Sequence, residues 1–154
     1  MMTMSRKYVA VIYDDETQEK LCDWCESNGF DLTKNYSGMD QEATDFEFHT
    51  TVSYSENEVS MKNETLPFKG EVFPVSFKLL GDNEDIPVLI VSSPELNNIR
   101  SEFEHRGLKD KWPDYLPHIS LSYVRKDYDL SGLKLPDFRM NFGRLTIEDI
   151  NEDV

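Results

Sequence analysis

The sequence carries the same six-residue pattern twice, and this repeat constrains the fold more than any other feature. Residues 49–54 read His-Thr-Thr-Val-Ser-Tyr and residues 118–123 read His-Ile-Ser-Leu-Ser-Tyr, so both fit H-x-[T/S]-x-S-Y. Short segments rich in β-branched and aromatic residues favour strands. The repeat therefore predicts two corresponding strands, each with a histidine at a matching position.

The segments around the two patterns also follow one order in each half of the chain: strand, helix, strand, strand. Apolar runs and helical spacing of apolar residues predict these elements. In the first half they are expected at 8–13, 15–28, about 46–55 and about 72–80. In the second half they are expected at 86–92, 94–106, about 117–124 and about 138–150. This order predicts an α+β fold built from a duplicated β-α-β-β unit.

Length and charge limit the classes of function. A chain of 154 residues suits one domain, spanning 1–154, with a first lobe at about 1–82 and a second at about 83–154. The formal net charge of −14 disfavours a long nucleic acid, which normally requires a basic stripe, and it disfavours a membrane surface. No apolar run is long enough to span a bilayer, and the N-terminal residues do not resemble a secretory leader. We expect a cytoplasmic protein.

Strand alternation assigns the residues of each pattern to two faces. In the first copy His49, Thr51 and Ser53 should share one face, with Thr50, Val52 and Tyr54 in the core. In the second copy His118, Ser120 and Ser122 should likewise share the exposed face. The core face should then hold Ile119, Leu121 and Tyr123. A face limited to imidazole and hydroxyl groups indicates a concave site rather than a solvated surface.

The chemistry of these faces suits a phosphate. One neutral imidazole can take a proton from a nucleophile while a protonated imidazole gives a proton to the leaving oxygen. Hydroxyl groups can hydrogen-bond the non-bridging oxygens. Two copies of the pattern supply both histidine roles near neutral pH, because the ordinary histidine pKa is about 6.5. The sequence therefore predicts a phosphodiesterase that needs no metal and no cofactor.

These residues resemble those of the 2H phosphoesterase superfamily, whose members carry two H-x-[T/S] motifs on strands of two pseudosymmetric lobes. The resemblance implies antiparallel sheets that flank a central cleft, with helices outside, and it implies catalytic roles for His49, Thr51, His118 and Ser120. The acidic composition and the Tyr-Asp-Asp after the first strand are most similar to the phage anti-CBASS phosphodiesterases. The resemblance then implies cyclic di- or trinucleotide immune signals as substrates, and contacts from Tyr13 and Glu148 to the ribose or base.

Other residues and other functions stay open. Tyr36, Trp112 and Tyr115 could stack on bases or pack at the rim. Cys22 and Cys25 lie within a predicted helix and lack the further ligands of a zinc site, which disfavours metal or redox chemistry. One alternative is a 2H enzyme that acts on RNA 2′,3′-cyclic phosphates or 2′–5′ linkages. The other is a non-enzymatic acidic mimic of nucleic acid, which would leave the two hexapeptides unexplained.

Overall fold

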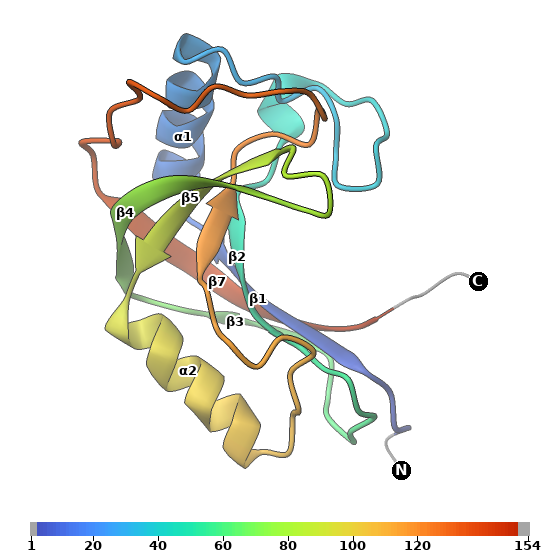
Figure 1. The fold of residues 1–154 in the computed structure, drawn as a ribbon. Helices are drawn as coiled ribbons and strands as arrows, with labels where there is room; N and C mark the ends of the chain where they lie inside the picture. Colours follow the sequence, from blue (N-terminus) through green and yellow to red (C-terminus); the bar gives the residue numbers. More distant parts are fainter. Residues whose placement is uncertain (1–2, 151–154) are drawn as a thin grey trace.

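A computed structural model describes residues 3–150, and it is an α+β fold, as predicted (Figure 1). Two α-helices flank seven strands that pair only antiparallel. The elements are, in chain order, β1 Lys7–Tyr13, α1 Asp15–Ser27, the 3-10 turn η1 Ala43–Asp45, β2 His49–Tyr54, β3 Glu64–Pro67, β4 Glu71–Leu80, β5 Ile86–Ser92, α2 Pro94–His105, β6 His118–Ser120 and β7 Met140–Asp149.

The strands form two sheets, and each sheet contains a strand from the other half of the chain. One sheet runs β2-β1-β7 with β3 on the far side of β7, and the other runs β4-β5-β6. The beginning of β7 also pairs with β4 through Asn141 and Met140, which joins the sheets. β4 precedes residue 82 in the chain, yet it pairs with β5 of the second half. β7 follows residue 82, yet it pairs with β1 of the first half. A boundary near residue 82 therefore does not separate the two sheets.

Both helices lie close to the predicted ranges 15–28 and 94–106, and each begins at a capping side chain. Ser93 caps α2 ahead of Pro94, and Asp14 caps α1, where its side chain accepts from the Thr17 backbone N–H. Gln18, in the first turn of α1, bonds both backbone groups of Phe48. This side chain therefore ties α1 to the residue that precedes His49.

Two strand predictions differ from the structure for identifiable reasons. β3 was not expected because its sequence is short and polar and ends in Pro67, features typical of an edge strand. β6 is only three residues long, although a strand was expected over about 117–124. The Leu121 N–H still donates to the Pro87 carbonyl over 2.9 Å, but proline has no N–H to return, so the ladder ends there.

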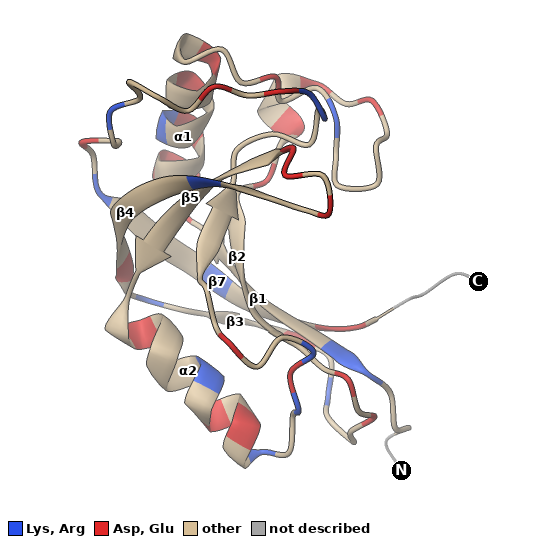
Figure 2. Ribbon diagram, in the orientation of Figure 1, with Lys and Arg blue, Asp and Glu red and all other residues tan. Residues whose placement is uncertain are grey.

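Charged side chains are spread over the whole molecule. Acidic residues occur on α1, on α2 and along the loops, with Lys and Arg between them (Figure 2). No helix in the range 3–150 is long and apolar enough to cross a membrane.

Candidate active site

The first hexapeptide lies on β2, and a bulge changes the face that its last residues occupy. Val9 pairs with Ser53 but Ala10 pairs with Thr51, so no residue of β1 stands opposite Val52. A bulge of this kind interrupts the alternation of side chains. Ser53 is therefore buried, and Tyr54 lines the pocket beside His49, the reverse of the predicted assignment.

The second hexapeptide shows the same change of face by a different route. Because β6 ends at Ser120, the chain after it no longer alternates as a strand. Ser122 is fully buried, and its hydroxyl donates to the Asp31 carbonyl over 2.6 Å. Tyr123 lines the pocket. In both copies the fifth residue is thus structural and the sixth residue faces the pocket, which was not predicted from strand alternation.

The two motif histidines are held in the same way. Nδ1 of His49 lies 3.1 Å from the Glu47 carbonyl oxygen, and Nδ1 of His118 lies 2.8 Å from the Leu116 carbonyl oxygen. A carbonyl can only accept, so each Nδ1 carries the hydrogen in these bonds. Each ring therefore leaves Nε2 for exchange of a proton with a ligand.

The two motif strands approach each other across the sheets. The Thr50 hydroxyl of β2 donates to the backbone carbonyl of His118 over 3.0 Å. Burial lowers the pKa of His118; the hydrogen bond to Leu116 opposes this shift, and the charge of His49 adds to it. The structure thus brings β2 and the backbone of β6 into contact, but His49 lines the pocket described below and His118 does not, so the convergence of both rings on one phosphate stays a prediction.

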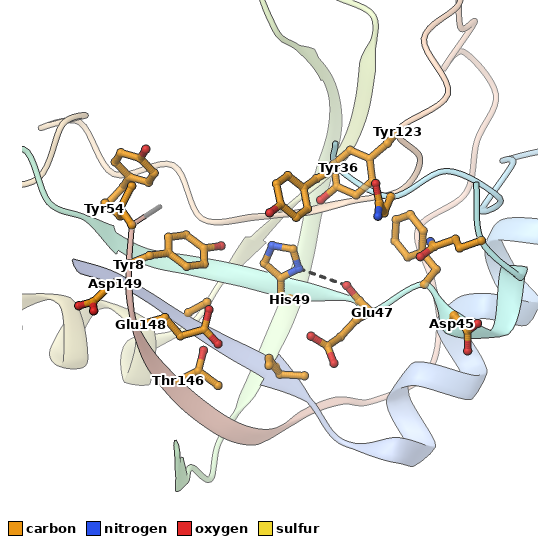
Figure 3. Close-up of a pocket in the computed structure, with 16 residues that line it drawn as sticks. Tyr8, Tyr36, Asp45, Glu47, His49, Tyr54, Tyr123, Thr146, Glu148 and Asp149 are labelled. Carbon is orange, nitrogen blue, oxygen red and sulfur yellow. Dashed lines mark hydrogen bonds between the residues drawn. The ribbon is translucent and has the colours of Figure 1, made fainter. Parts of the chain in front are cut away.

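A pocket of about 620 Å³ opens on the concave face of the first sheet (Figure 3). Its floor comes from alternate residues of β1 and from residues of β2 and β7, and part of its wall comes from segment 35–47. The residues that line it are Tyr8, Ala10, Ile12, Asn35, Tyr36, Gln41, Asp45, Phe46, Glu47, His49, Tyr54, Tyr123, Thr146, Glu148, Asp149 and Ile150. In Figure 3, Tyr8 lies beside the His49 ring, Tyr36 lies above it, and Glu148 lies below Tyr8. The volume lies within the range of small-ligand sites, about 300–1,000 Å³.

The two motif hydroxyls border this pocket through tyrosines that line it. Thr51 Oγ1 lies 2.9 Å from the Tyr8 hydroxyl, and Ser120 is hydrogen-bonded to Tyr123. Burial, the largest cause, raises the pKa of Tyr8 to about 12, so this phenol keeps its proton at neutral pH. Thr51 therefore lies next to a tyrosine of the neighbouring strand β1, and Ser120 lies next to the tyrosine of its own motif.

The two predicted substrate-contacting residues have different positions. Glu148 lines the pocket, so a contact with substrate remains a prediction there. Tyr13 is only 1% exposed, and its hydroxyl bonds Thr50 over 2.7 Å. It lies on the opposite face of β1 from the pocket residues, and the predicted contact is wrong because strand alternation turns its ring into the core.

The loop aromatics and the cysteines also have defined places. Tyr36 lines the pocket and is 83% exposed, while Trp112 packs against Tyr54 with ring centroids 5.5 Å apart. Tyr115 donates its hydroxyl to the Thr51 carbonyl. Burial is the largest cause that raises the pKa of Cys22, to about 11, so this thiol is protonated at neutral pH. Within residues 3–150 no three His, Cys, Asp or Glu side chains gather as metal ligands.

The α+β fold, with one histidine motif on β2 and the other on β6, is the arrangement that the resemblance to 2H phosphoesterases implied. A crystal structure of E. coli LigT complexed with 3′-AMP is similar, with a TM-score of 0.55 and 15% identity over 99% of this chain and 91% of that chain. At this identity the likeness shows the fold alone. Residues 5–154 match the family described as "Anti-CBASS protein Acb1", and the chain belongs to that family. No similar sequence was found among curated proteins.

Proposed function

We propose that the chain is a metal-independent phosphodiesterase that hydrolyses 3′–5′ bonds of cyclic di- and trinucleotide immune signals in the host cytoplasm, and thereby counters CBASS defence. One observation carries this proposal. His49 and His118 each use Nδ1 to bind the carbonyl two residues earlier, so both leave Nε2 for proton transfer. Membership of an anti-CBASS family supports the class of substrate.

The mechanism assigns complementary roles to the histidines. His118, whose pKa is lowered chiefly by burial, takes the proton from a ribose 2′-hydroxyl. The 2′ oxygen then forms a bond to phosphorus, and the bond from phosphorus to the 5′ oxygen breaks. His49 gives its proton to that leaving oxygen. The roles then reverse as water opens the 2′,3′-cyclic phosphate to a linear product that ends in phosphate.

The neighbours of the histidines suit a small ligand. Thr51 and Ser120 supply hydroxyls for the non-bridging oxygens, and the lining carboxylates accept hydrogen bonds from donors such as ribose hydroxyls or base amino groups. Glu148 is the carboxylate proposed to contact ribose or base. Asp45, Glu47 and Asp149 repel further phosphates, which disfavours a long nucleic acid in this pocket.

The proposal is tested with a panel of cyclic di- and trinucleotides incubated with the protein in excess chelator, with products identified by mass. Alanine at His49 or His118 should reduce the rate about 10²–10⁴-fold, and loss of the Thr51 or Ser120 hydroxyl about 10²–10³-fold. His105→Ala is the matched control, because this histidine lies on α2 and bonds Ser101 within its own helix. Cleavage at the wild-type rate in His118→Ala, or cleavage that stops in chelator, refutes the mechanism.

The same panel separates the rival functions. RNA ends bearing 2′,3′-cyclic phosphate and 2′–5′ linked oligonucleotides are included, and faster turnover of these would point to an RNA-processing enzyme. Absence of any turnover, together with salt-dependent binding to a basic protein that does not change in His49→Ala, would favour the acidic mimic.

A further inference from the structure

A buried arginine outside the pocket holds the strand that carries the first motif. Arg100 lies on α2 and is 7% exposed. Nη1 donates to the Val52 carbonyl over 2.9 Å and to Asp110 Oδ2 over 3.0 Å, and Nη2 donates to the Trp112 carbonyl over 2.8 Å. Burial of a guanidinium destabilises a fold unless its N–H donors are hydrogen-bonded. The three acceptors therefore offset the burial of Arg100 and hold its side chain in one position.

The carbonyl that Arg100 binds belongs to the bulged residue of β2. Since β1 places no residue opposite Val52, the ladder is interrupted there, and the guanidinium supplies a donor from outside the sheet. The bulge is what turns Tyr54, rather than Ser53, toward the pocket. Arg100 therefore stabilises the backbone geometry on which the face of Tyr54 depends.

The partners of Arg100 extend this support toward both motifs. Asp110 Oδ2 also accepts from the Tyr54 N–H over 3.0 Å. The Tyr115 ring lies under the guanidinium, 4.3 Å from ring centroid to Cζ, and its hydroxyl donates to the Thr51 carbonyl over 2.8 Å. His118 follows Tyr115 by three residues in the chain. One buried ion pair thus connects the backbone of Thr51 and Tyr54 with the segment that leads into β6.

We propose that Arg100, acting through Asp110 and Tyr115, is a positioning residue that sets the placement of Thr51 and Tyr54 in the active site. This inference rests on the proposed phosphodiesterase function. None of the three residues lines the catalytic pocket, so they act through the β2 backbone and not on the substrate. Residues outside the pocket can affect the rate in this way, because displacement of a catalytic group by about 1 Å can lower the rate about 10²-fold.

The test uses Arg100→Lys, which keeps the charge but lacks the planar fork that reaches three acceptors at once. We expect kcat to fall about 10–100-fold at a temperature where circular dichroism shows the variant folded. The pH profile should be unchanged, because the histidines are intact. Tyr115→Phe deletes one hydroxyl and should lower kcat in the same direction. Arg106→Lys, an exposed arginine at the end of the same helix, is the matched control.

A double mutant separates positioning from general destabilisation. In a Thr51→Val background, Arg100→Lys should lower kcat by less than in wild type, since the positioned Thr51 hydroxyl is already absent and only the effect through Tyr54 remains. Unchanged kcat in the folded Arg100→Lys protein, or an undiminished loss in the Thr51→Val background, overturns the proposal.

A second readout does not depend on activity. Hydrogen exchange of the Tyr54 backbone amide, which donates to Asp110, should accelerate in Arg100→Lys and not in Arg106→Lys. If wild type cleaves no cyclic nucleotide, the proposed function fails while this exchange experiment still decides the structural inference. An unchanged exchange rate would refute it.

Discussion

The hydroxyl of Thr50 joins the two halves of the molecule, and its removal should destabilise the fold in a way that a second substitution partly repairs. Thr50 is fully buried, and its single hydroxyl hydrogen goes to the His118 carbonyl over 3.0 Å. The Tyr13 hydroxyl lies 2.7 Å from Thr50 Oγ1. Because Thr50 has no second hydroxyl hydrogen, Tyr13 must be the donor in the bond between these two hydroxyls. The order of donation runs from Tyr13 through Thr50 to the backbone of His118.

This order sets different magnitudes for the two single variants. Thr50→Val leaves the Tyr13 hydroxyl buried without an acceptor, which costs about 1–3 kcal/mol, and removes the bond to His118, which costs about 1 kcal/mol. We therefore expect a loss of about 2–4 kcal/mol in the free energy of unfolding. Tyr13→Phe removes one bond and leaves the bond from Thr50 to His118 intact, so it should cost only about 1 kcal/mol.

The double variant distinguishes this account from simple additivity. Thr50→Val with Tyr13→Phe has no stranded hydroxyl, so it should be more stable than Thr50→Val alone by at least about 1 kcal/mol. The assay is urea unfolding followed by tryptophan fluorescence and checked by circular dichroism for a single transition. If the double variant is less stable than Thr50→Val, the assigned direction of donation is wrong.

Three further predictions follow from single features of the structure. Burial lowers the pKa of His118 in the folded state, so the stability this residue contributes is present above its ordinary value of 6.5 and is lost as pH falls below that value. His118→Gln should therefore flatten the dependence of the unfolding free energy on pH below about 6.5, and an unchanged slope contradicts this. A Cβ at Gly143 would lie 3.0 Å from the Asp14 Cα, so Gly143→Ala should cost about 1–3 kcal/mol in urea unfolding, and a neutral result would show that the helix start can shift. Ser122→Ala should lower stability by about 1–3 kcal/mol with kcat retained, whereas Ser120→Ala should lower kcat with stability retained; the opposite pattern would mean that the third and fifth motif positions have been assigned the wrong way round.

The sequence was a good guide where local pattern and local physics agree. The helices and the buried strands β1 and β5 follow from short-range signals. Alternation failed from the fifth motif position onward. In β2 the cause is a bulge, and in the second copy it is a ladder stopped by Pro87, and neither is visible from the residues of the motif themselves.

Arg100 shows why part of the site could not be found from sequence. On a helix rich in acidic residues, an arginine four positions from Glu104 is typical of a solvated ion pair. Arg100 does pair with Glu104, but its guanidinium also bonds Val52 and Asp110, which come from a strand and a loop that only the tertiary fold brings together. Such a residue carries no local pattern that distinguishes it from a surface arginine.

The placement of the second histidine depends on bonds between lobes more than on its own strand. β6 has only three residues at the edge of its sheet, so its ladder alone is a weak constraint. His118 is held by the Thr50 hydroxyl, by its own bond to Leu116, and through the segment that Asp110 and Tyr115 fasten to β2. Because those fastening bonds reach the backbone of the strand that carries His49, a shift of either motif disturbs the other. The two motifs therefore behave as one unit, which is what the proposed exchange of acid and base roles across a single phosphate would require.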